Sequence, residues 1–376
     1  MNMSRLRPHV GIAIIFFIGI FVVSVFGTAS IPRIPTTTIQ NASSTLAVVN
    51  TVATTSAQTP IIPVPKKVIP PAPKPTPKPA PATPLKATPI SAPTSLLPSE
   101  SASLDASAVT LRAALVNIIC YAPAGSGLRS ISGSGVIVDP KGIILTNAHI
   151  AQNFLLADRN VSCTIRAGSP AIDTYKASLI YISPAWIQAN ANILTQTNPS
   201  GTGEYDFAFL AITKSATSAA LPSSFSFIPL ATAPPSSGTP VVIASYGAQF
   251  LESNQIQSFL FPTIVFGSVK DVFTFAATTI DVLTLGGSAA AQEGSSGGGV
   301  AGGNGKLVGT ITTSTTNGST DTRKLDAITA SYIRAEYANE TGRALDLLLT
   351  EATSTSVANF APQIPALESI LTANLK

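Results

Sequence analysis

Histidine and cysteine are scarce in this sequence, and their scarcity limits the chemistry that the chain can perform. Its 376 residues include only two histidines and two cysteines. These residues do not have the spacing of a metal site, and the sequence has no glycine-rich loop of the kind that binds a nucleotide. We therefore expect no metal and no other cofactor.

Acidic residues are absent from the N-terminal part of the chain. No Asp or Glu precedes Glu100, whereas eight of the 22 Lys and Arg do, so the remainder carries 14 basic against 18 acidic residues. The formal net charge of +4 therefore hides a mildly acidic folded part. No basic cluster with interleaved aromatic residues occurs there, so we expect no nucleic-acid partner.

Residues 1–30 have the pattern of a signal anchor. Arg5 and Arg7 precede a nearly uninterrupted apolar run from Val10 to Phe26. As a helix this run would span about 26 Å, close to the hydrocarbon core of a membrane. The basic flank would keep the N-terminus in the cytoplasm and place the rest of the chain outside. The alternative is a signal peptide cleaved near Gly27-Thr28-Ala29, which would give a secreted protein.

Residues 31–100 are predicted to be a Pro/Lys-rich disordered linker. Such composition favours extended polyproline II, in which about 3.1 Å per residue gives a reach on the order of 100 to 200 Å. The linker would act as a spacer that holds a domain away from the membrane. Its lysines could instead contact anionic polymers of the cell wall or lipid headgroups.

Short β-branched or aromatic segments, separated by turn residues, fill most of residues 101–350. None alternates with a long helix, so the sequence predicts an all-β fold of two tandem six-stranded antiparallel barrels, at about 114–213 and 239–320. The expected strands are 115–121, 135–138, 142–146, 161–166, 177–182 and 207–212, then 240–245, 263–269, 272–276, 279–283, 306–312 and 325–328.

Helices are expected at both ends of these barrels. Ser103 or Asp105 would cap a short helix at 106–114, and apolar residues at helical spacing predict C-terminal helices within 325–350 that pack on the second barrel. Residues 351–376 are expected to be a flexible tail because Thr, Ser and Ala dominate them. The long segment 184–204, which contains the single tryptophan, is either a binding loop or a tolerated insertion.

A Ser/Gly stretch at 292–299, Gln-Glu-Gly-Ser-Ser-Gly-Gly-Gly, is the first candidate site. Such a run is often a flexible loop. Here strand-like sequence flanks it on both sides, so its glycines are interpreted as a sharp turn, since glycine tolerates a positive φ. Such a turn can project the Ser296 hydroxyl while its backbone N–H groups point at one spot.

Serine chemistry also needs a base and a group that orients the base. His9 lies in the N-terminal flank, so His149 is the sole candidate base in the exported part, although a lone histidine can be structural. Asp206 opens an otherwise apolar strand, where burial would strengthen its bond to the histidine. A turn-capping Asp is the alternative interpretation.

Five segments together resemble a known family. They are Ser134-Gly135-Val136-Ile137-Val138, Thr146-Asn147-Ala148-His149, Tyr205-Asp206-Phe207-Ala208, Gly294-Ser295-Ser296-Gly297-Gly298 and Lys306-Leu307-Val308-Gly309. They resemble the chymotrypsin-like (trypsin-like) serine peptidases, particularly the bacterial HtrA-like branch, over about residues 110–340. The order His, Asp, Ser matches, and so do the intervals of 57 and 90 residues between them.

The resemblance implies two Greek-key barrels and assigns roles to residues. Ser296 would be the nucleophile, His149 the general acid and base, and Asp206 its orienting partner, while the N–H groups of Gly294 and Ser296 would form the oxyanion hole. Ser295 stands where the branch usually has Asn or Asp, which puts the oxyanion turn in doubt. Gly299 stands where Pro is common.

The same resemblance implies a substrate pocket with a floor near Ala290 and a wall near Thr312, Thr313 and Ser314. Nothing acidic maps to the floor, so we expect a small or medium apolar P1 residue rather than Lys or Arg. Glu293 is expected at the pocket mouth or as a solvated turn residue. No PDZ domain is expected, because too few residues follow the last helical pattern.

Cys120 and Cys163 fall on the first and fourth strands, which are neighbours in a barrel of this family. The resemblance therefore implies a disulfide between them in an exported chain, and two buried free thiols are the alternative.

Three functions remain open from the sequence. The first is a membrane-tethered extracytoplasmic serine endopeptidase that acts on proteins. The second is a catalytically silent trypsin-like fold that serves as an envelope binding module, which the departure at Ser295 suggests. The third is a structural stalk that spans the cell wall, which explains the Pro-rich linker but not His149, Asp206 and Ser296.

Overall fold

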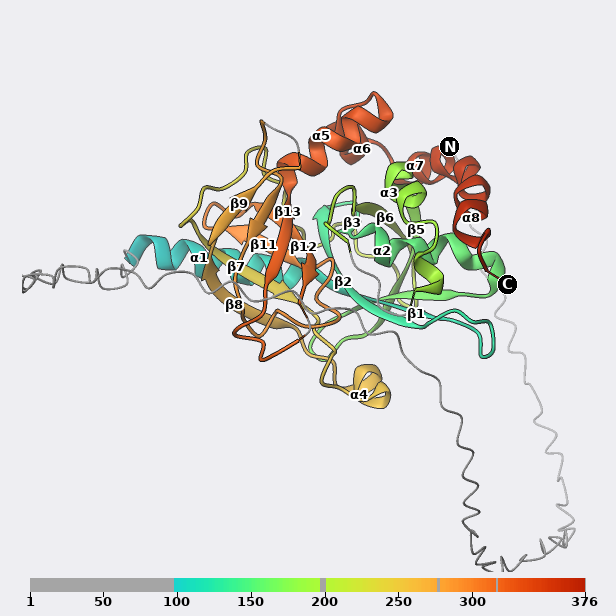
Figure 1. Ribbon diagram of the computed structural model, residues 1–376, viewed down its shortest axis with the longest axis horizontal. Helices are drawn as coiled ribbons and strands as arrows, with labels where there is room; N and C mark the ends of the chain where they lie inside the picture. Colours follow the sequence, from blue (N-terminus) through green and yellow to red (C-terminus); the bar gives the residue numbers. More distant parts are fainter. Residues whose placement is uncertain (1–97, 197–200, 276–277, 316, 376) are drawn as a thin grey trace, which may run out of the picture. The chain divides into compact units, whose positions relative to one another are not determined.

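The structure is a computed structural model that describes residues 98–196, 201–275, 278–315 and 317–375 (Figure 1). The predicted signal anchor and nearly all of the predicted linker lie outside these residues. Among the helices that are described, none is both long and apolar enough to span a membrane.

A closed six-stranded barrel occupies the first half of the described chain. Its strands lie in the order β1-β2-β3-β6-β5-β4, and each neighbouring pair is antiparallel. The run β4-β1-β2-β3 has the Greek-key order. Buried aliphatic and aromatic residues such as Ile118, Ile143 and Phe209 fill the core. The strands are β1 (Leu115–Tyr121), β2 (Ile131–Asp139), β3 (Ile143–Thr146), β4 (Ser162–Ala167), β5 (Ile172–Ile182) and β6 (Ala208–Ser215).

The second sheet differs from the expected six-stranded barrel. Seven strands pair in the order β8-β7-β11-β12-β13-β10-β9, and among the described residues β8 and β9 do not pair with each other, so the sheet stays open. The chain changes its pairing partner between β8 and β9. The Val269 N–H donates to the Thr239 carbonyl next to β7, whereas the Lys270 N–H donates to the Thr284 carbonyl at the end of β10. The strands are β7 (Pro240–Ser245), β8 (Thr263–Ser268), β9 (Asp271–Phe273), β10 (Val282–Thr284), β11 (Gly299–Gly302), β12 (Leu307–Ser314) and β13 (Leu325–Thr329).

Strand β11 was not among the expected strands. Its sequence, Gly-Val-Ala-Gly, has a single β-branched residue, Val300, and no aromatic residue, so it lacks the composition that marks a strand. It nevertheless lies between β7 and β12 in the sheet. A side chain at Gly299 would meet Leu111, Leu307 and Val136 at 2.7 to 3.0 Å, so close packing explains the glycine.

Helix α1 (Pro98–Ala114) is longer than the expected segment and packs on strands β7 and β11 of the second sheet (Figure 1). Leu104 and Leu111 are buried against that sheet, and the Ser107 hydroxyl donates to the Gly302 carbonyl at 2.8 Å. The helix then runs directly into β1 of the barrel. It therefore contacts one β unit and begins the other.

The expected flexible tail is helical where it is described. Helices α7 (Thr353–Phe360), η3 (Ala361–Gln363) and α8 (Ile364–Thr372) follow α5 (Ala330–Thr341) and α6 (Leu345–Thr350) and pack on the barrel (Figure 1). Phe360, Leu367 and Leu371 are buried. The prediction was wrong because it weighed the Thr/Ser/Ala composition above the helical spacing of these apolar residues.

The long segment 184–204 is partly helical. Helix α3 (Pro184–Ala189) is capped by the Ser183 hydroxyl, which accepts from the N–H of Trp186 at 3.1 Å, and η2 (Ile193–Thr195) follows. Trp186 and Ile187 are buried, and α3 packs against α8. The described part of this segment therefore packs against the C-terminal helix α8. The remaining short helices are α2 (Ala148–Ala151), η1 (Gln152–Arg159) and α4 (Ser253–Ser258).

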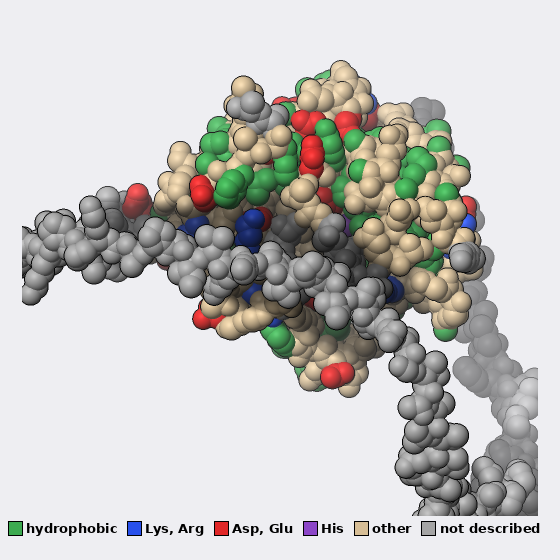
Figure 2. Space-filling view, viewed as in Figure 1, with side chains coloured by type: hydrophobic (Ala, Val, Ile, Leu, Met, Phe, Trp, Pro, Cys, Tyr) green, Lys and Arg blue, Asp and Glu red, His purple; other side chains and the backbone are tan. Residues whose placement is uncertain are grey.

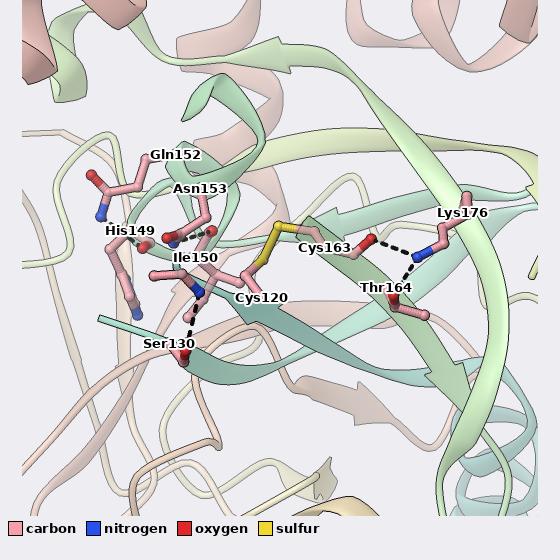
Figure 3. Close-up of a disulfide and its surroundings, with 10 residues drawn as sticks. Cys120, Ser130, His149, Ile150, Gln152, Asn153, Cys163, Thr164 and Lys176 are labelled. Carbon is pink, nitrogen blue, oxygen red and sulfur yellow. Dashed lines mark hydrogen bonds between the residues drawn. A yellow bond between two sulfur atoms is a disulfide. The ribbon is translucent and has the colours of Figure 1, made fainter. Parts of the chain in front are cut away.

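The expected disulfide joins Cys120 on β1 to Cys163 on β4, with a sulfur–sulfur distance of 2.07 Å. The two residues face each other in the β1–β4 register. Figure 3 shows the bridge together with His149 and Ile150, which belong to helix α2. The disulfide therefore lies in the part of the barrel that carries the candidate base.

Candidate functional site

His149 and Asp206 lie at the same end of two neighbouring strands. Thr146 at the end of β3 pairs with Ala208 at the start of β6, so the residues just beyond them meet. Asp206 Oδ2 lies 2.7 Å from His149 Nδ1, and Asp206 Oδ1 accepts the backbone N–H of His149 at 2.9 Å. The carboxylate therefore fixes both the ring and the backbone of the histidine, and Nε2 is left available for proton transfer.

A third group binds the same carboxylate. The Thr312 hydroxyl donates to Asp206 Oδ2 at 2.8 Å, and both side chains are buried. Thr312 comes from β12 of the second sheet, so the bond joins the two β units at the site. We expected Thr312 only as a pocket wall; its bond to Asp206 has no local sequence signal, because the two residues are 106 positions apart.

The residue before Asp206 has an unusual backbone conformation. Tyr205 has a φ of 55°, and its N–H donates to the hydroxyl of Tyr332 on α5 at 3.0 Å. Burial raises the pKa of Tyr332 above its usual range, which further favours the protonated hydroxyl. Positive φ is costly for a non-glycine residue. The contact with the second half of the chain therefore helps to hold the turn that presents Asp206.

The Ser296 turn depends on two glycines with positive φ. Gly294 has φ of 90° and Gly297 has φ of 84°. A side chain at Gly297 would lie 1.9 Å from the Ser134 carbonyl oxygen and 2.5 Å from the Thr146 hydroxyl. The turn therefore packs directly on β2 and β3 of the barrel, as only glycine permits.

Ser134 on β2 binds this turn with its N–H and its hydroxyl. Its N–H donates to the Ser296 carbonyl at 2.7 Å, and its hydroxyl donates to the Gly294 carbonyl at 2.8 Å. The same hydroxyl accepts the N–H of Tyr246 at 2.8 Å, and the Ser134 carbonyl accepts the Thr146 hydroxyl at 2.7 Å. The turn is thus joined to the end of β3, three residues before His149.

These contacts bring the three candidate catalytic residues to one junction between the two β units. His149 follows β3 and Asp206 precedes β6 in the barrel, whereas Ser296 lies in the connection between β10 and β11 of the second sheet. Among the described residues, no hydrogen bond joins the Ser296 hydroxyl to the His149 ring. Such bonds are often long in a free enzyme and shorten when substrate binds.

Some backbone donors of the Ser296 turn, the Glu293 N–H among them, have no acceptor among the described residues. Ser295, Gly297 and Gly298 donate their N–H groups to carbonyls of the protein at 2.9 to 3.2 Å. The N–H groups of Gly294 and Ser296 have no acceptor among the described residues. These are the two donors that the resemblance assigns to the oxyanion hole.

Ser295 is buried and has a partner. Its side-chain oxygen accepts a hydrogen bond from the Ser245 hydroxyl at 3.0 Å, inside the second sheet. A neutral hydroxyl pair therefore occupies the position where the resembling branch carries Asn or Asp. The Ser295 hydroxyl has a hydrogen-bond partner, so this departure leaves no unsatisfied buried polar group beside the turn.

The other residues of the expected pocket fall in different surroundings. Ala290 is fully buried, and Glu293 is exposed with its carbonyl accepting the Ala248 N–H at 2.8 Å. Thr313 and Ser314 belong to β12, and their side chains lie outside the described part of the chain. The described residues contain no group of three His, Cys, Asp or Glu side chains that could hold a metal ion.

Comparisons with known proteins concern the same region. Residues 133–309, which include His149, Asp206 and Ser296, match the family model described as a trypsin-like peptidase domain. No curated protein sequence matches the chain. The crystal structure of the active form of the Rv3671c protease from M. tuberculosis is similar at 18% identity and a TM-score of 0.40, covering 70% of this chain and 96% of that one. An inactive form of the Rv3671c protease is similar at 16% identity and a TM-score of 0.39, covering 62% and 92%.

Proposed function

We propose that this chain is a serine endopeptidase of the HtrA-like branch that cleaves proteins through a triad of Ser296, His149 and Asp206. The observation that carries the proposal is the pair of hydrogen bonds between the Asp206 carboxylate and His149, to Nδ1 at 2.7 Å and to the backbone N–H at 2.9 Å. They lie beside a turn that presents Ser296. The trypsin-like family match supports the same assignment.

The proposed reaction follows from the roles of these groups. His149 Nε2 removes the proton of the Ser296 hydroxyl as the oxygen attacks the scissile carbonyl, and Asp206 stabilises the imidazolium that forms. The N–H groups of Gly294 and Ser296 bind the developing oxyanion, a contribution of about 3 to 4 kcal/mol per donor. His149 then gives the proton to the leaving amine, and water hydrolyses the acyl-enzyme by the same route.

We propose a small or medium apolar P1 residue for the substrate. Ala290 at the expected floor is a small, uncharged side chain, and the nearby carboxylate of Glu293 is exposed rather than buried in a pocket. A basic P1 side chain would lack a buried partner there, and an unpaired buried charge is strongly unfavourable. Cleavage of a peptide library identifies the preferred residue.

We propose further that the peptidase is tethered to the cell membrane by residues 1–30 and held at a distance by the linker at 31–100. The support is the apolar run after Arg5 and Arg7 and the Pro/Lys-rich composition. Sequencing the N-terminus of the mature protein tests the tether. A start at or beyond Ser30 would show that the protein is secreted instead.

Covalent labelling tests the catalytic proposal. A fluorophosphonate probe should form one adduct at Ser296, and Ser296→Ala and His149→Ala should each abolish it. Ser237→Ala, which removes an exposed serine far along the chain, is the control and should be labelled like the wild type. A folded wild-type protein that stays unlabelled would instead favour the catalytically silent binding module.

A further inference from the structure

Arg323 lies buried beside the Ser296 turn, in the connection between β12 and β13. Only 5% of its surface is exposed. Its Nε donates to the Gly318 carbonyl at 3.0 Å, and its Nη1 donates to the Ala291 carbonyl at 2.8 Å and to Gln249 Oε1 at 2.6 Å. The ring of Phe250 lies 5.7 Å from the guanidinium carbon.

These acceptors belong to three separate connections. Gly318 lies between β12 and β13, Ala291 lies between β10 and β11, and Gln249 lies between β7 and β8. One planar guanidinium, with several donors in a fixed arrangement, therefore joins all three. A further contact brings two of the connections together, because a side chain at Gly287 would collide with the Asp321 carbonyl at 2.1 Å.

Stability alone does not account for a charge at this place. The ion pairs of the described residues do not include Arg323. Removing a cation from water is costly, and well-packed apolar residues often stabilise a protein as well as a buried charge does. The distinctive feature of Arg323 is that its hydrogen bonds fix the positions of three irregular segments relative to one another.

The same segments determine where the oxyanion donors lie. Ala291 is three residues before Gly294 in the turn. The neighbouring connection supports this turn, because the Ala248 N–H donates to the Glu293 carbonyl at 2.8 Å. A side chain at Gly294 would lie 2.7 Å from the Tyr246 carbonyl oxygen, so the two backbones are in direct contact. A shift of either connection would move the N–H of Gly294.

We propose that Arg323 is a positioning residue for the oxyanion hole, holding the Gly294 N–H in place by joining the three connections around it. This inference rests on the proposed function. Arg323 itself touches neither substrate nor the reacting atoms. Its effect would therefore appear in transition-state binding more than in substrate binding.

The test compares two equally buried arginines in the full chain. Arg323→Met removes the donors and keeps an unbranched side chain. Arg166→Met is the matched control: Arg166 is 3% exposed and donates to the Ile256 carbonyl at 2.9 Å, at the far end of the same β7–β8 connection. For each variant, thermal unfolding reports folding, peptide cleavage gives kcat and KM, and a peptide boronate reports transition-state affinity.

Loss of one oxyanion donor costs about 100- to 1,000-fold in kcat, so a displaced donor should cost about 10- to 100-fold. We expect this loss in Arg323→Met, with an equal loss of boronate affinity and KM within about threefold of the wild type. The kcat of Arg323→Lys should lie between those of the wild type and Arg323→Met, because an ammonium cannot reproduce the planar arrangement of donors. Arg166→Met should keep kcat within about threefold of the wild type.

Three results would overturn the inference. They are wild-type kcat in folded Arg323→Met, an equal loss in Arg166→Met, and a loss confined to KM with unchanged boronate affinity. If Arg323→Met does not fold, Arg323→Lys decides by the same measurements. A labelled, active wild type with unaffected variants would refute only the positioning role, whereas an unlabelled and inactive wild type would refute the proposed function and this inference with it.

Discussion

Thr312 was expected in the substrate pocket, but its hydroxyl binds the carboxylate that orients the candidate base. Thr312→Val separates these two roles, because valine keeps the shape of threonine and lacks the hydroxyl. In the variant, Asp206 Oδ2 would lose the donor that lies at 2.8 Å and keep its contact with His149. Asp206 is 5% exposed and Thr312 is 4% exposed, so water does not readily replace the lost bond.

The expected loss follows from the charge of the acceptor. A hydrogen bond to a charged group contributes about 1.5 to 3 kcal/mol. If the bond holds Asp206 in the orientation that stabilises the imidazolium, this energy is lost from the transition state, and kcat should fall about 10- to 150-fold. The loss should be similar for substrates with different P1 residues, since Asp206 does not contact the substrate. Steady-state kinetics with a series of peptides that differ only at P1 gives these values.

Thr312→Ser is the matched control, because it keeps the hydroxyl and removes the methyl group. If Thr312 orients Asp206, the kcat of Thr312→Ser should lie near that of the wild type. If Thr312 is instead a wall of the substrate pocket, Thr312→Ser should change the P1 preference and Thr312→Val should not. That second pattern would refute the role derived from the hydrogen bond.

Three further predictions concern the framework around the site. Gly297→Ala should abolish labelling at Ser296 and lower the melting temperature, because the new Cβ would lie 1.9 Å from the Ser134 carbonyl oxygen. Gly305→Ala is the control, because Gly305 also has a positive φ, of 71°, but has open space around it. This control should lose only the backbone penalty of about 1 to 2 kcal/mol. Equal losses of melting temperature in the two variants would contradict the packing argument. Replacing Cys120 and Cys163 by alanine should lower the free energy of unfolding by about 4 kcal/mol, given their sequence separation of 43; denaturant titration measures it, and a change below about 1 kcal/mol would speak against the estimate. Burial, with Glu340, Asp281 and Glu204 nearby, raises the pKa of Glu336, so its ionised form is disfavoured in the folded state and stability falls as pH rises through that pKa. Glu336→Gln should therefore raise the melting temperature at pH 7, and this gain should vanish below the usual carboxyl pKa of 4.5, whereas a gain that persists at low pH would exclude the charge as its cause.

The sequence predicted those elements whose own residues specify them. The strands at 115–121 and 240–245 were expected with the bounds that β1 and β7 have, because β-branched residues lie between clear turn signals. Strand β11 was missed because pairing with β7 and β12 overrides its glycine-rich composition. The helices α7 and α8 were missed because the Thr, Ser and Ala composition outweighed the helical spacing of Phe360, Leu367 and Leu371, which are buried where these helices pack.

The candidate site shows the same limit at single residues. Cys120 and Cys163 could be paired in advance, because the family resemblance places them on neighbouring strands. The contribution of Thr312 to Asp206 could not, because it depends on how the second sheet packs against the barrel. Arg323 also escaped notice, since its three acceptors lie between 5 and 74 positions away and form no motif.

Ser134 shows why this packing decides the chemistry. In the sequence it belongs only to a segment that resembles the family, yet its N–H and hydroxyl donate to the Ser296 and Gly294 carbonyls at 2.7 and 2.8 Å. Both carbonyls belong to the turn that would carry the nucleophile and the oxyanion donors. Since Ser134 lies on β2 of the barrel, these bonds set the position of Ser296 relative to His149 across the junction of the two β units. The doubt that Ser295 raised about the turn is therefore reduced, because the turn is held by Ser134 and two positive-φ glycines, and Ser295 needs only the neutral partner that Ser245 provides.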